Sequence, residues 1–185
     1  MTIRILRAAD HRRKPWKNGR GETVEVAVYP QGAGLHDFGW RVSMAGVVED
    51  GAFSIFSGVD RTLAVLTGNG IELQIKGMAS ELLTPDSHPL SFPADVACSA
   101  RLGNGPISDL NIMTRRGLYR HRLDRNTVTS GSDFRLILAT GAVTVALGGT
   151  AYRLDALDAI YCDGPEASLP LGPIAGVWLI EIDRI

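Results

Sequence analysis

Arginine, asparagine and aromatic side chains mark the segments of this sequence that could do chemistry. In residues 53–61, Phe53 and Phe56 precede the pair Asp60–Arg61, and we expect a strand that leads into a turn. Arg61 could hold a carboxylate through two parallel hydrogen bonds, with Asp60 orienting it and the two rings forming an apolar wall. The alternative is a surface salt bridge between Asp60 and Arg61, which would contribute about 0–1 kcal/mol.

Two alternating segments add polar candidates. Residues 40–45 place Arg41 and Ser43 on one face of a strand, either inside a polar barrel or toward solvent. In residues 108–117, one face carries Asp109, Asn111, Met113 and Arg115. A polar face on an otherwise apolar strand predicts that these residues line a pocket.

The glycine-rich residues 15–23 are the most distinctive local feature. The candidate ligand contacts in this segment are Trp16 as a flat apolar wall, Lys17 as a cation and Asn18 for hydrogen bonding, while Gly19 and Gly21 would allow close backbone approach. The segment lacks the GK[ST] ending of a phosphate-binding loop and leads directly into a strand. It is either a loop at a pocket mouth or a tight strand entry with Trp16 packed in the core.

The histidines do not have the spacing of a metal site. A site on neighbouring strands needs about three imidazoles and a carboxylate, often with two of the histidines as HxH. The four histidines are His11, His36, His88 and His121, and they form no such pair. Cys98 and Cys162 are predicted to be reduced thiols on or near strands. No Ser/His/Asp order or nucleophile elbow is present. We therefore predict no metal, no cofactor and no catalytic residue.

Short alternating strands must position these residues. The 21 glycines and 9 prolines interrupt the chain at the spacing typical of an all-β sandwich or barrel. Alternation with period two is clear at residues 23–29, 40–44 and 71–76. A short helical turn is expected near residues 8–13, and no helix of ten or more residues is expected.

A weak internal repeat of roughly seventy residues divides the chain. Residues 63–68 resemble residues 136–141, and the two copies close with apolar strands at 110–113 and 177–182. We predict an all-β bicupin, a single unit over residues 1–185 with two jelly-roll, cupin-like barrels and very little helix. The expected parts are an N-terminal barrel with shared strands (1–117), a linker (118–132) and a C-terminal barrel (133–185).

Composition narrows the function. The formal net charge of −1 argues against a dedicated nucleic-acid binder, and the basic run after residue 115 is better explained as a solvated linker. No apolar run approaches the ~18 residues needed to span a bilayer, and no signal peptide is recognisable. We expect a cytoplasmic protein that binds neither nucleic acid nor a membrane. A homodimer stays open.

Several linked motifs resemble the HutD/Ves family. They are PWKNGRGET at residues 15–23, WRVSMA at 40–45, FSIFSGVDR at 53–61, FPAD at 92–95 and GPISDLNIMTRRG at 105–117. The resemblance implies a double cupin-like barrel and a regulator or binder of intermediates in histidine utilisation. The chain departs from the family pattern at Arg20, Val24 and Leu110, which could alter the pocket mouth and the ligand.

These observations predict a metal-independent protein that binds a small anionic ligand, a carboxylate such as urocanate or a formyl- or formimino-glutamate. The predicted ligand-binding residues are Trp16, Lys17, Asn18, Gly19, Arg41, Ser43, Phe53, Phe56, Arg61, Asn111 and Arg115. Two alternatives stay open. One is a cofactor-free enzyme acting on the same ligands, with a shifted carboxylate or Lys17 as its catalytic group, and the other is a protein-interaction role for the basic linker.

Overall fold

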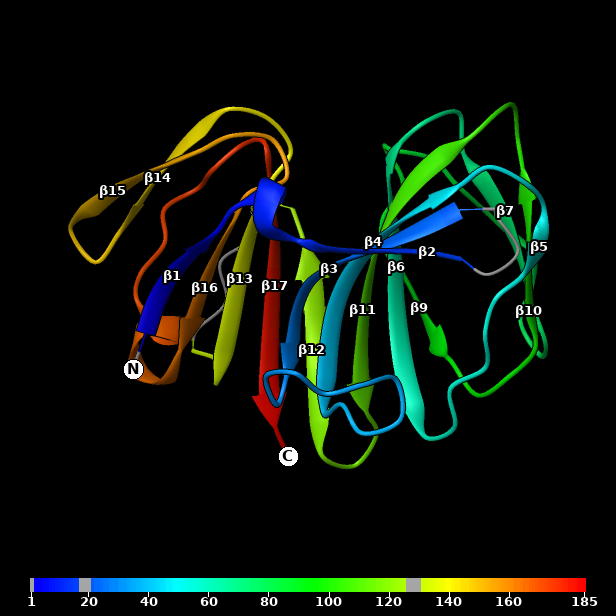
Figure 1. The fold of residues 1–185 in the computed structure, drawn as a ribbon, viewed down its shortest axis with the longest axis horizontal. Helices are drawn as coiled ribbons and strands as arrows, with labels where there is room; N and C mark the ends of the chain where they lie inside the picture. Colours follow the sequence, from blue (N-terminus) through cyan, green and yellow to red (C-terminus); the bar gives the residue numbers. More distant parts are fainter. Residues whose placement is uncertain (1, 17–20, 126–130) are drawn as a thin grey trace. The chain divides into compact units, whose positions relative to one another are not determined.

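The structure is a computed structural model that describes residues 2–16, 21–125 and 131–185. These residues form seventeen β-strands and two short 3₁₀ helices (Figure 1). In chain order they are β1 (Thr2–Leu6), η1 (Ala8–Asp10), β2 (Arg12–Pro15), β3 (Gly21–Tyr29), β4 (Trp40–Val47), β5 (Gly51–Ala52), β6 (Val59–Thr67), β7 (Ile71–Ile75), β8 (Glu81–Leu83), β9 (Leu90–Pro93), β10 (Cys98–Leu102), β11 (Ile107–Arg115), β12 (Tyr119–Asp124), β13 (Phe134–Ala139), β14 (Val143–Leu147), β15 (Thr150–Leu154), β16 (Ala159–Asp163), η2 (Gly164–Ser168) and β17 (Val177–Arg184). The prediction of an all-β chain with very little helix is confirmed. Neither described helix is long and apolar enough to cross a membrane.

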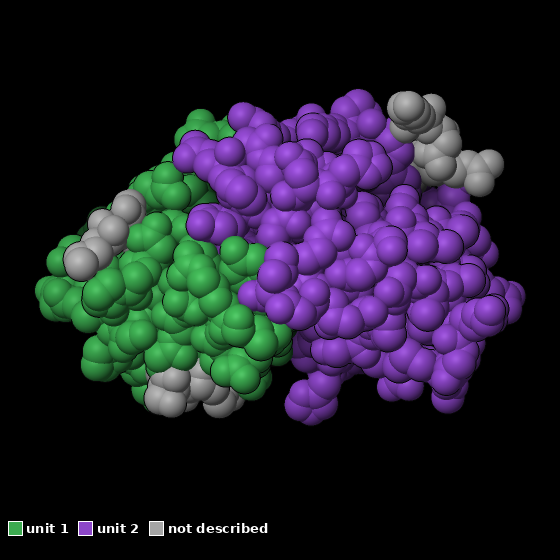
Figure 2. All heavy atoms as spheres, turned by 90° about the horizontal axis from the view of Figure 1, so that it is seen from below, with its two compact units in different colours: residues 1–11, 119–185 green, residues 12–118 purple. Residues whose placement is uncertain are grey.

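The chain forms two compact units (Figure 2). Unit 1 comprises residues 1–11 and 119–185, and unit 2 comprises residues 12–118. The structure thus differs from the linker expected at 118–132, because β12 pairs with β17 in unit 1. Arg120 and Arg122 bind Asp183 on β17, and Arg122 also binds Glu181. A basic segment is therefore stable as a strand here because its partner strand is acidic.

Unit 2 contains two sheets. The six-stranded sheet has the order β2-β3-β4-β11-β6-β9, and the four-stranded sheet has the order β5-β10-β7-β8. Alternate residues of β6 and β7 share one hydrophobic cluster, which includes Leu63, Val65, Ile71 and Leu73. The alternation of apolar residues seen in the sequence thus places one face of each strand in the core.

Unit 1 is built around a five-stranded sheet with the order β1-β16-β13-β17-β12. The hairpin β14–β15 contributes Val145, Leu147 and Leu154 to the core cluster of this unit, where they join Ile137 and Leu179. β1 is the N-terminal strand and pairs with β16. The first residues of the chain therefore belong with the C-terminal part, not with the N-terminal barrel expected over 1–117.

The internal repeat corresponds to a shared strand order. β6 lies between β11 and β9, and β13 lies between β17 and β16. A β-bulge shifts the register in unit 2, where Ser108 pairs with Thr67 but Asp109 pairs with Val65. Leu66 is thus an extra residue in β6 that has no counterpart in β13. For residues of β6 before Leu66, the structurally matching residue of β13 is therefore one position later than in the ungapped sequence repeat. Counted with the bulge, Arg61 of β6 corresponds to Arg135 of β13.

Candidate functional site

Polar side chains gather on the inner face of the six-stranded sheet of unit 2. Antiparallel neighbours that lie opposite each other point to the same face. One row across the sheet runs from Glu25 through Ser43 and Asn111 to Leu63, the last of which belongs to the core cluster. The adjacent row contains Arg41, Met113, Arg61 and Phe92. Both predicted arginines are therefore on one buried face, and the solvent-facing alternative for Arg41 and Ser43 is wrong.

Arg61 is almost fully buried, at 5% exposure, yet has no carboxylate in salt-bridge contact among the described residues. Its guanidinium lies 5.2 Å from the ring centroid of Phe53, 5.5 Å from that of Phe56 and 5.8 Å from that of Phe92. Within the described part of the chain, its one hydrogen bond is to the Met113 sulfur, at 3.5 Å, and its Nε has no partner. Burial lowers the pKa of Arg61, and Asp109 opposes this. A buried guanidinium held by aromatic faces and a weak acceptor is equipped to bind an anion.

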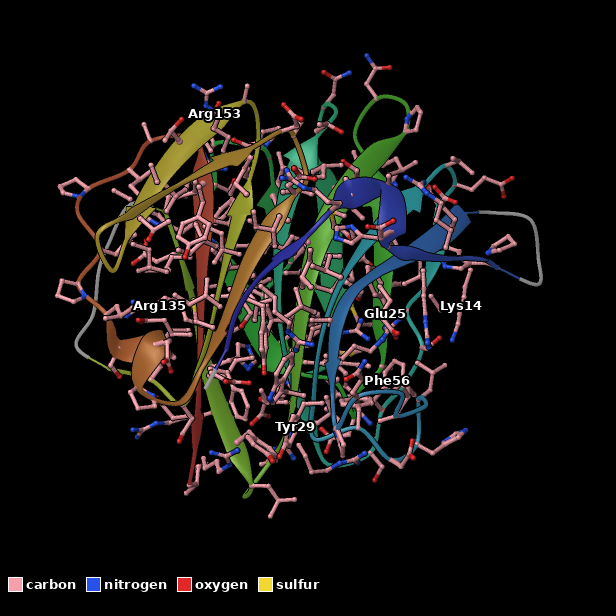
Figure 3. The ribbon with its side chains drawn as sticks, turned by 60° about the vertical axis from the view of Figure 1, so that its left-hand side comes forward. Lys14, Glu25, Tyr29, Phe56, Arg135 and Arg153 are labelled. Carbon is pink, nitrogen blue, oxygen red and sulfur yellow. The ribbon has the colours of Figure 1, made fainter. Side chains whose placement is uncertain are left out.

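The second arginine of the cluster is paired. Arg41 Nε donates to Glu25 Oε2 at 3.0 Å, and Arg41 NH1 donates to Ser43 Oγ at 3.4 Å. Glu25 projects from β3, and Figure 3 labels it in unit 2 together with Phe56. This pair fixes the direction of the Arg41 side chain while leaving further N–H groups of its guanidinium for another acceptor.

Asp109 and Asn111 complete the polar face on β11. Asp109 is fully buried, and its Oδ1 accepts from the backbone N–H of Ala45 at 3.2 Å and from Asn111 Nδ2 at 2.6 Å. Its Oδ2 has no partner in the described structure. Burial raises the pKa of Asp109 to about 7, against the lowering effect of Arg61. This carboxyl can therefore gain or lose a proton near neutral pH.

Unit 1 has an arginine at the position that matches Arg61, but with a different partner. Arg135 lies opposite Glu181, and its NH2 donates to Glu181 Oε1 at 2.9 Å, with both residues buried. Arg61 lies opposite Met113 instead. The position on β11 that matches Glu181 is therefore Met113, which carries no charge. Figure 3 labels Arg135 on β13.

The charged residues Asp60 and Arg116 lie outside this cluster. Asp60 and Arg61 point to opposite faces of β6, so Asp60 does not orient Arg61 but pairs with Arg116, 2.7 Å away. Arg116 also binds Asp95, and this contact lowers the pKa of Asp95. Residues 53–56 are not a strand, and the turn at 57–58 precedes β6. Because the turn comes before Asp60 and Arg61, both residues lie within strand β6, where neighbouring side chains point to opposite faces.

Arg115 also lies apart from the cluster. It is half-buried, and its guanidinium donates to the carbonyl oxygens of Ser57, His36 and Phe38. It lies 5.3 Å from the centroid of the Phe38 ring. These contacts tie two loops to the end of β11, so the structure assigns Arg115 a structural role.

The glycine-rich segment has its described ends packed together. The Trp16 N–H donates to the carbonyl oxygen of Gly21 at 2.8 Å, and Trp16 Nε1 donates to Thr23 Oγ1 at 2.8 Å. Trp16 is half-buried against the core cluster of unit 2. The predicted site residues Lys17, Asn18 and Gly19 lie outside the described residues.

Gly21 has no room for a side chain. A Cβ at this position would overlap the carbonyl oxygen of Gly46 on β4 and lie 3.1 Å from the Trp16 ring. We expect Gly21→Ala to lower the free energy of unfolding by about 1–3 kcal/mol, because a backbone oxygen cannot move aside as a flexible side chain can. Urea denaturation measures this change. Gly51→Ala, where a Cβ meets nothing within 4 Å, is the matched control, and an equal effect in both variants would contradict the expectation.

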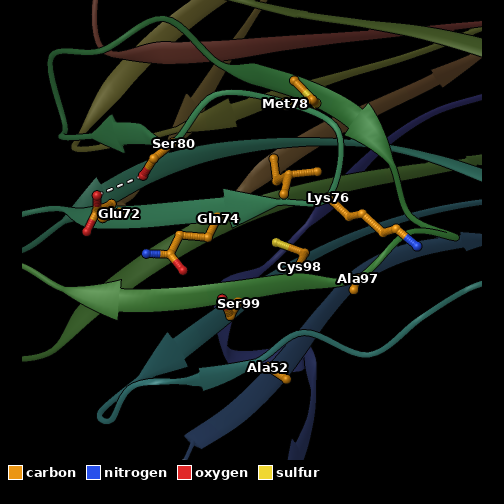
Figure 4. A pocket seen from close by; sticks show the side chains of 10 residues that line it. Ala52, Glu72, Gln74, Lys76, Met78, Ser80, Ala97, Cys98 and Ser99 are labelled. Atoms are coloured by element: carbon orange, nitrogen blue, oxygen red, sulfur yellow. Dashed lines mark hydrogen bonds between the residues drawn. The ribbon is translucent and has the colours of Figure 1, made fainter.

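A second concave feature lies on the outer face of the four-stranded sheet (Figure 4). It is a depression of about 570 Å³ lined by Ala52, Glu72, Gln74, Ile75, Lys76, Met78, Ser80, Ala97, Cys98 and Ser99. Within it, Ser80 Oγ donates to Glu72 Oε1 at 2.7 Å. It contains none of the predicted ligand-binding residues, and its polar groups are mostly solvent-exposed. The buried cluster around Arg61 therefore remains the candidate site.

The described residues include no group of three or more His, Cys, Asp or Glu side chains that could hold a metal ion. The two cysteines are free and buried on strands, as predicted. Burial raises the pKa of the Cys98 thiol, and raises that of Cys162 to about 11. Both are therefore poor nucleophiles.

Two acidic members of the cluster are absent from the ligand-binding residues predicted from the sequence. Glu25 lies within the alternating segment at residues 23–29, but the bulge between Glu25 and Ala27 makes its facing direction unpredictable from alternation alone. Asp109 was recognised on the polar face of its strand but was not selected as a site residue. The sequence signal for Asp109 is its position two residues before Asn111, which places both side chains on one face of the strand.

Comparisons with known proteins place the chain in a family. A family model described as HutD matches residues 8–177. The chain belongs to the HutD family. A relative in Pseudomonas putida, named as an uncharacterized 21.2 kDa protein in the hutC 3' region, is 36% identical over 187 residues and covers 97% of each chain. Protein Ves of Citrobacter koseri is 38% identical over 122 residues, which cover 63% of this HutD-family chain and 62% of Ves.

Solved structures agree with this assignment. HutD from Pseudomonas fluorescens SBW25 has a TM-score of 0.83 and 34% identity, covering 100% of both chains. A conserved protein of unknown function from Pseudomonas aeruginosa PAO1 has a TM-score of 0.85 and 34% identity, covering 99% of this chain and 100% of the other. The E. coli protein Ylba, at 10% identity and a TM-score of 0.67 over 99% of this chain and 90% of its own, shares the fold alone. The fold of this HutD-family chain is all-β and cupin-like.

Proposed function

We propose that this HutD-family protein binds a small carboxylate at the inner face of unit 2 without a metal. The observation that carries the proposal is the buried Arg61, which lacks the carboxylate partner that Glu181 supplies to Arg135 in unit 1. Burying a charge without a directly contacting carboxylate is costly even though Asp109 offsets part of that cost, so the retention of Arg61 favours a function in binding. In unit 2, a ligand carboxylate would lie beside Arg61 as Glu181 lies beside Arg135 in unit 1.

Other residues of the face support this role. Arg41 lies in the same row as Arg61, and Ser43 and the Asn111 amide lie in the adjacent row of the same face. Phe53 and Phe56 flank the Arg61 guanidinium. A hydrogen bond to a charged group contributes about 1.5–3 kcal/mol. The binding free energy of two arginine contacts, less the cost of ordering the ligand and the side chains, is consistent with roughly micromolar affinity.

The ligand that we propose is an intermediate of histidine catabolism, such as urocanate or a formyl- or formimino-glutamate, and the protein would act as a regulator or accessory factor of that pathway in the cytoplasm. The names of two relatives support the association, since one carries the name HutD and the other is named for the hutC 3' region. Each candidate ligand carries at least one carboxylate.

Titration calorimetry with urocanate and N-formylglutamate tests the site. We expect Arg61→Met to weaken binding by about 30-fold or more, because the variant keeps an apolar chain among the three rings but removes the charge. Arg115→Met is the matched control, since that arginine lies on the same sheet but its guanidinium donates to backbone oxygens and lies over the Phe38 ring. Unchanged affinity in Arg61→Met, or equal losses in both variants, would refute the site.

A cofactor-free enzyme is the second candidate function, and one observation favours it. The pKa of Asp109 is raised to about 7, which suits a general acid or base at neutral pH. Nuclear magnetic resonance of urocanate or formylglutamate incubated with chelator-treated protein would detect turnover. Loss of that turnover in Asp109→Asn would be required to assign it to this group.

A further inference from the structure

Asp109 has a buried acceptor that the protein itself leaves unused. Its Oδ1 already accepts two hydrogen bonds, from the Ala45 N–H and from Asn111 Nδ2. Its Oδ2 is buried and has no partner in the described part of the chain. Such a group is normally satisfied by protein or water, so an orphaned oxygen on a binding face indicates a missing donor.

The unused acceptor and the unused donor lie at two ends of one face. Arg61 is opposite Met113, and Asp109 lies four residues before Met113 on the same strand. Four residues of an antiparallel strand span about 14 Å between Cα atoms, and the long arginine side chain covers part of that length. Asn111 and Ser43 lie in the row between them. The face therefore offers an anion site at one end and a hydrogen-bond acceptor at the other.

Unit 1 shows that the fold does not need this carboxyl. Counted with the bulge, the positions on β17 that match Asp109 and Asn111 are Val177 and Leu179, which are buried in the core of unit 1. The same strand position is thus apolar in one unit and acidic in the other. An acidic group at a position that the fold can fill with valine points to a role in recognition.

We propose that Asp109 is the specificity-determining residue of this site, and that it selects elongated carboxylates that carry an N–H donor at the end away from the carboxylate. This inference rests on the proposed function, because it assumes that Arg61 holds the carboxylate. A ligand with an apolar or acceptor atom at its far end leaves Asp109 Oδ2 buried and unpaired. A ligand with an N–H group there completes the hydrogen bonding of both the protein and the ligand.

Two synthetic probes isolate the donor. They are 3-(pyrrol-3-yl)acrylate and 3-(furan-3-yl)acrylate, which share a five-membered ring and an acrylate chain. At the ring position away from the chain, the first carries an N–H and the second an oxygen. Neither ring titrates near neutral pH. At pH 8 we expect the pyrrole probe to bind the wild-type protein about tenfold or more tightly than the furan probe, as measured by titration calorimetry.

Asp109→Asn should bring that ratio close to one, because the amide replaces the free acceptor with a donor. Glu25→Gln is the matched control, since it also removes one carboxylate from the same face but leaves Asp109 in place, so it should shift both affinities and preserve their ratio. The inference is overturned by equal affinities in the wild type, by binding of neither probe, or by a preference that survives Asp109→Asn. Failure of the proposed function is a different result, in which carboxylate binding does not depend on Arg61.

Discussion

Arg135→Met is expected to lower the free energy of unfolding by about 3–5 kcal/mol, because it leaves Glu181 as a buried charge without its main partner. Arg135 and Glu181 are exposed by only 1% and 2% at their side chains. Arg135 NH1 also donates to the Leu169 carbonyl oxygen at 2.7 Å, and this bond would be lost. Arg122, which is partly exposed, would remain as a weaker partner of Glu181. Chemical denaturation followed by circular dichroism measures the change.

The double variant Arg135→Met with Glu181→Leu separates the cost of the orphaned charge from the loss of the pair. It should recover most of the stability, since a buried ion pair can often be replaced by apolar residues with little net cost. Arg122 keeps Asp183 as its partner in that variant. If the double variant is as unstable as Arg135→Met, burial of an unpaired Glu181 is not the cause.

Asp109→Asn should stabilise the protein above neutral pH. The pKa of Asp109 is raised to about 7 in the folded protein, mainly by burial, against about 3.9 for an exposed aspartate. Between these values the folded state holds a proton that the unfolded state has released, so stability falls as the pH rises from about 4 to about 7 and is then level. Asparagine removes this loss, which reaches about 4 kcal/mol at pH 8. The wild type and the variant should differ little at pH 4.

Thermal unfolding at one-unit steps from pH 4 to pH 8 tests this expectation. The gap in melting temperature should widen to roughly 8 °C or more in favour of the variant, given about 2–4 °C for each kcal/mol in a chain of this size. A gap that is constant with pH would contradict the titration of Asp109 as its origin. A variant that is more stable but less selective would also show that the carboxyl is kept for recognition.

Much of the fold could be predicted from alternation and turn residues. The strands expected at residues 71–76 and 177–182 are present as β7 and β17, and the repeat at 63–68 and 136–141 corresponds to β6 and β13. β12 is not predicted because its arginines hide the alternation, and the acidic residues of β17 that bind them are far away along the chain. Pairing between distant segments is not visible in local sequence patterns.

The candidate site could be predicted only in part, because contacts between distant strands are not visible in local sequence patterns. Strand alternation correctly put Arg41 with Ser43, and motif content identified Arg61, which the structure brings onto the same face. The partners of these residues depend on bulges, since one extra residue reverses the facing direction of everything beyond it. Glu25 lies directly before such a bulge, and Asp109 directly beside another. The turn at 57–58 likewise decided that Asp60 faces away from Arg61.

The duplicated arginine also bears on stoichiometry. In unit 1 the chain supplies its own anion, because Glu181 is covalently part of the sheet and is held beside Arg135 at a very high effective concentration. A free carboxylate cannot compete with it there. In the proposed site, Arg61 is the one of these two related arginines that binds the ligand, so the binding curve should be hyperbolic with one molecule bound per chain. Any sigmoidal response to the ligand would have to come from association between chains.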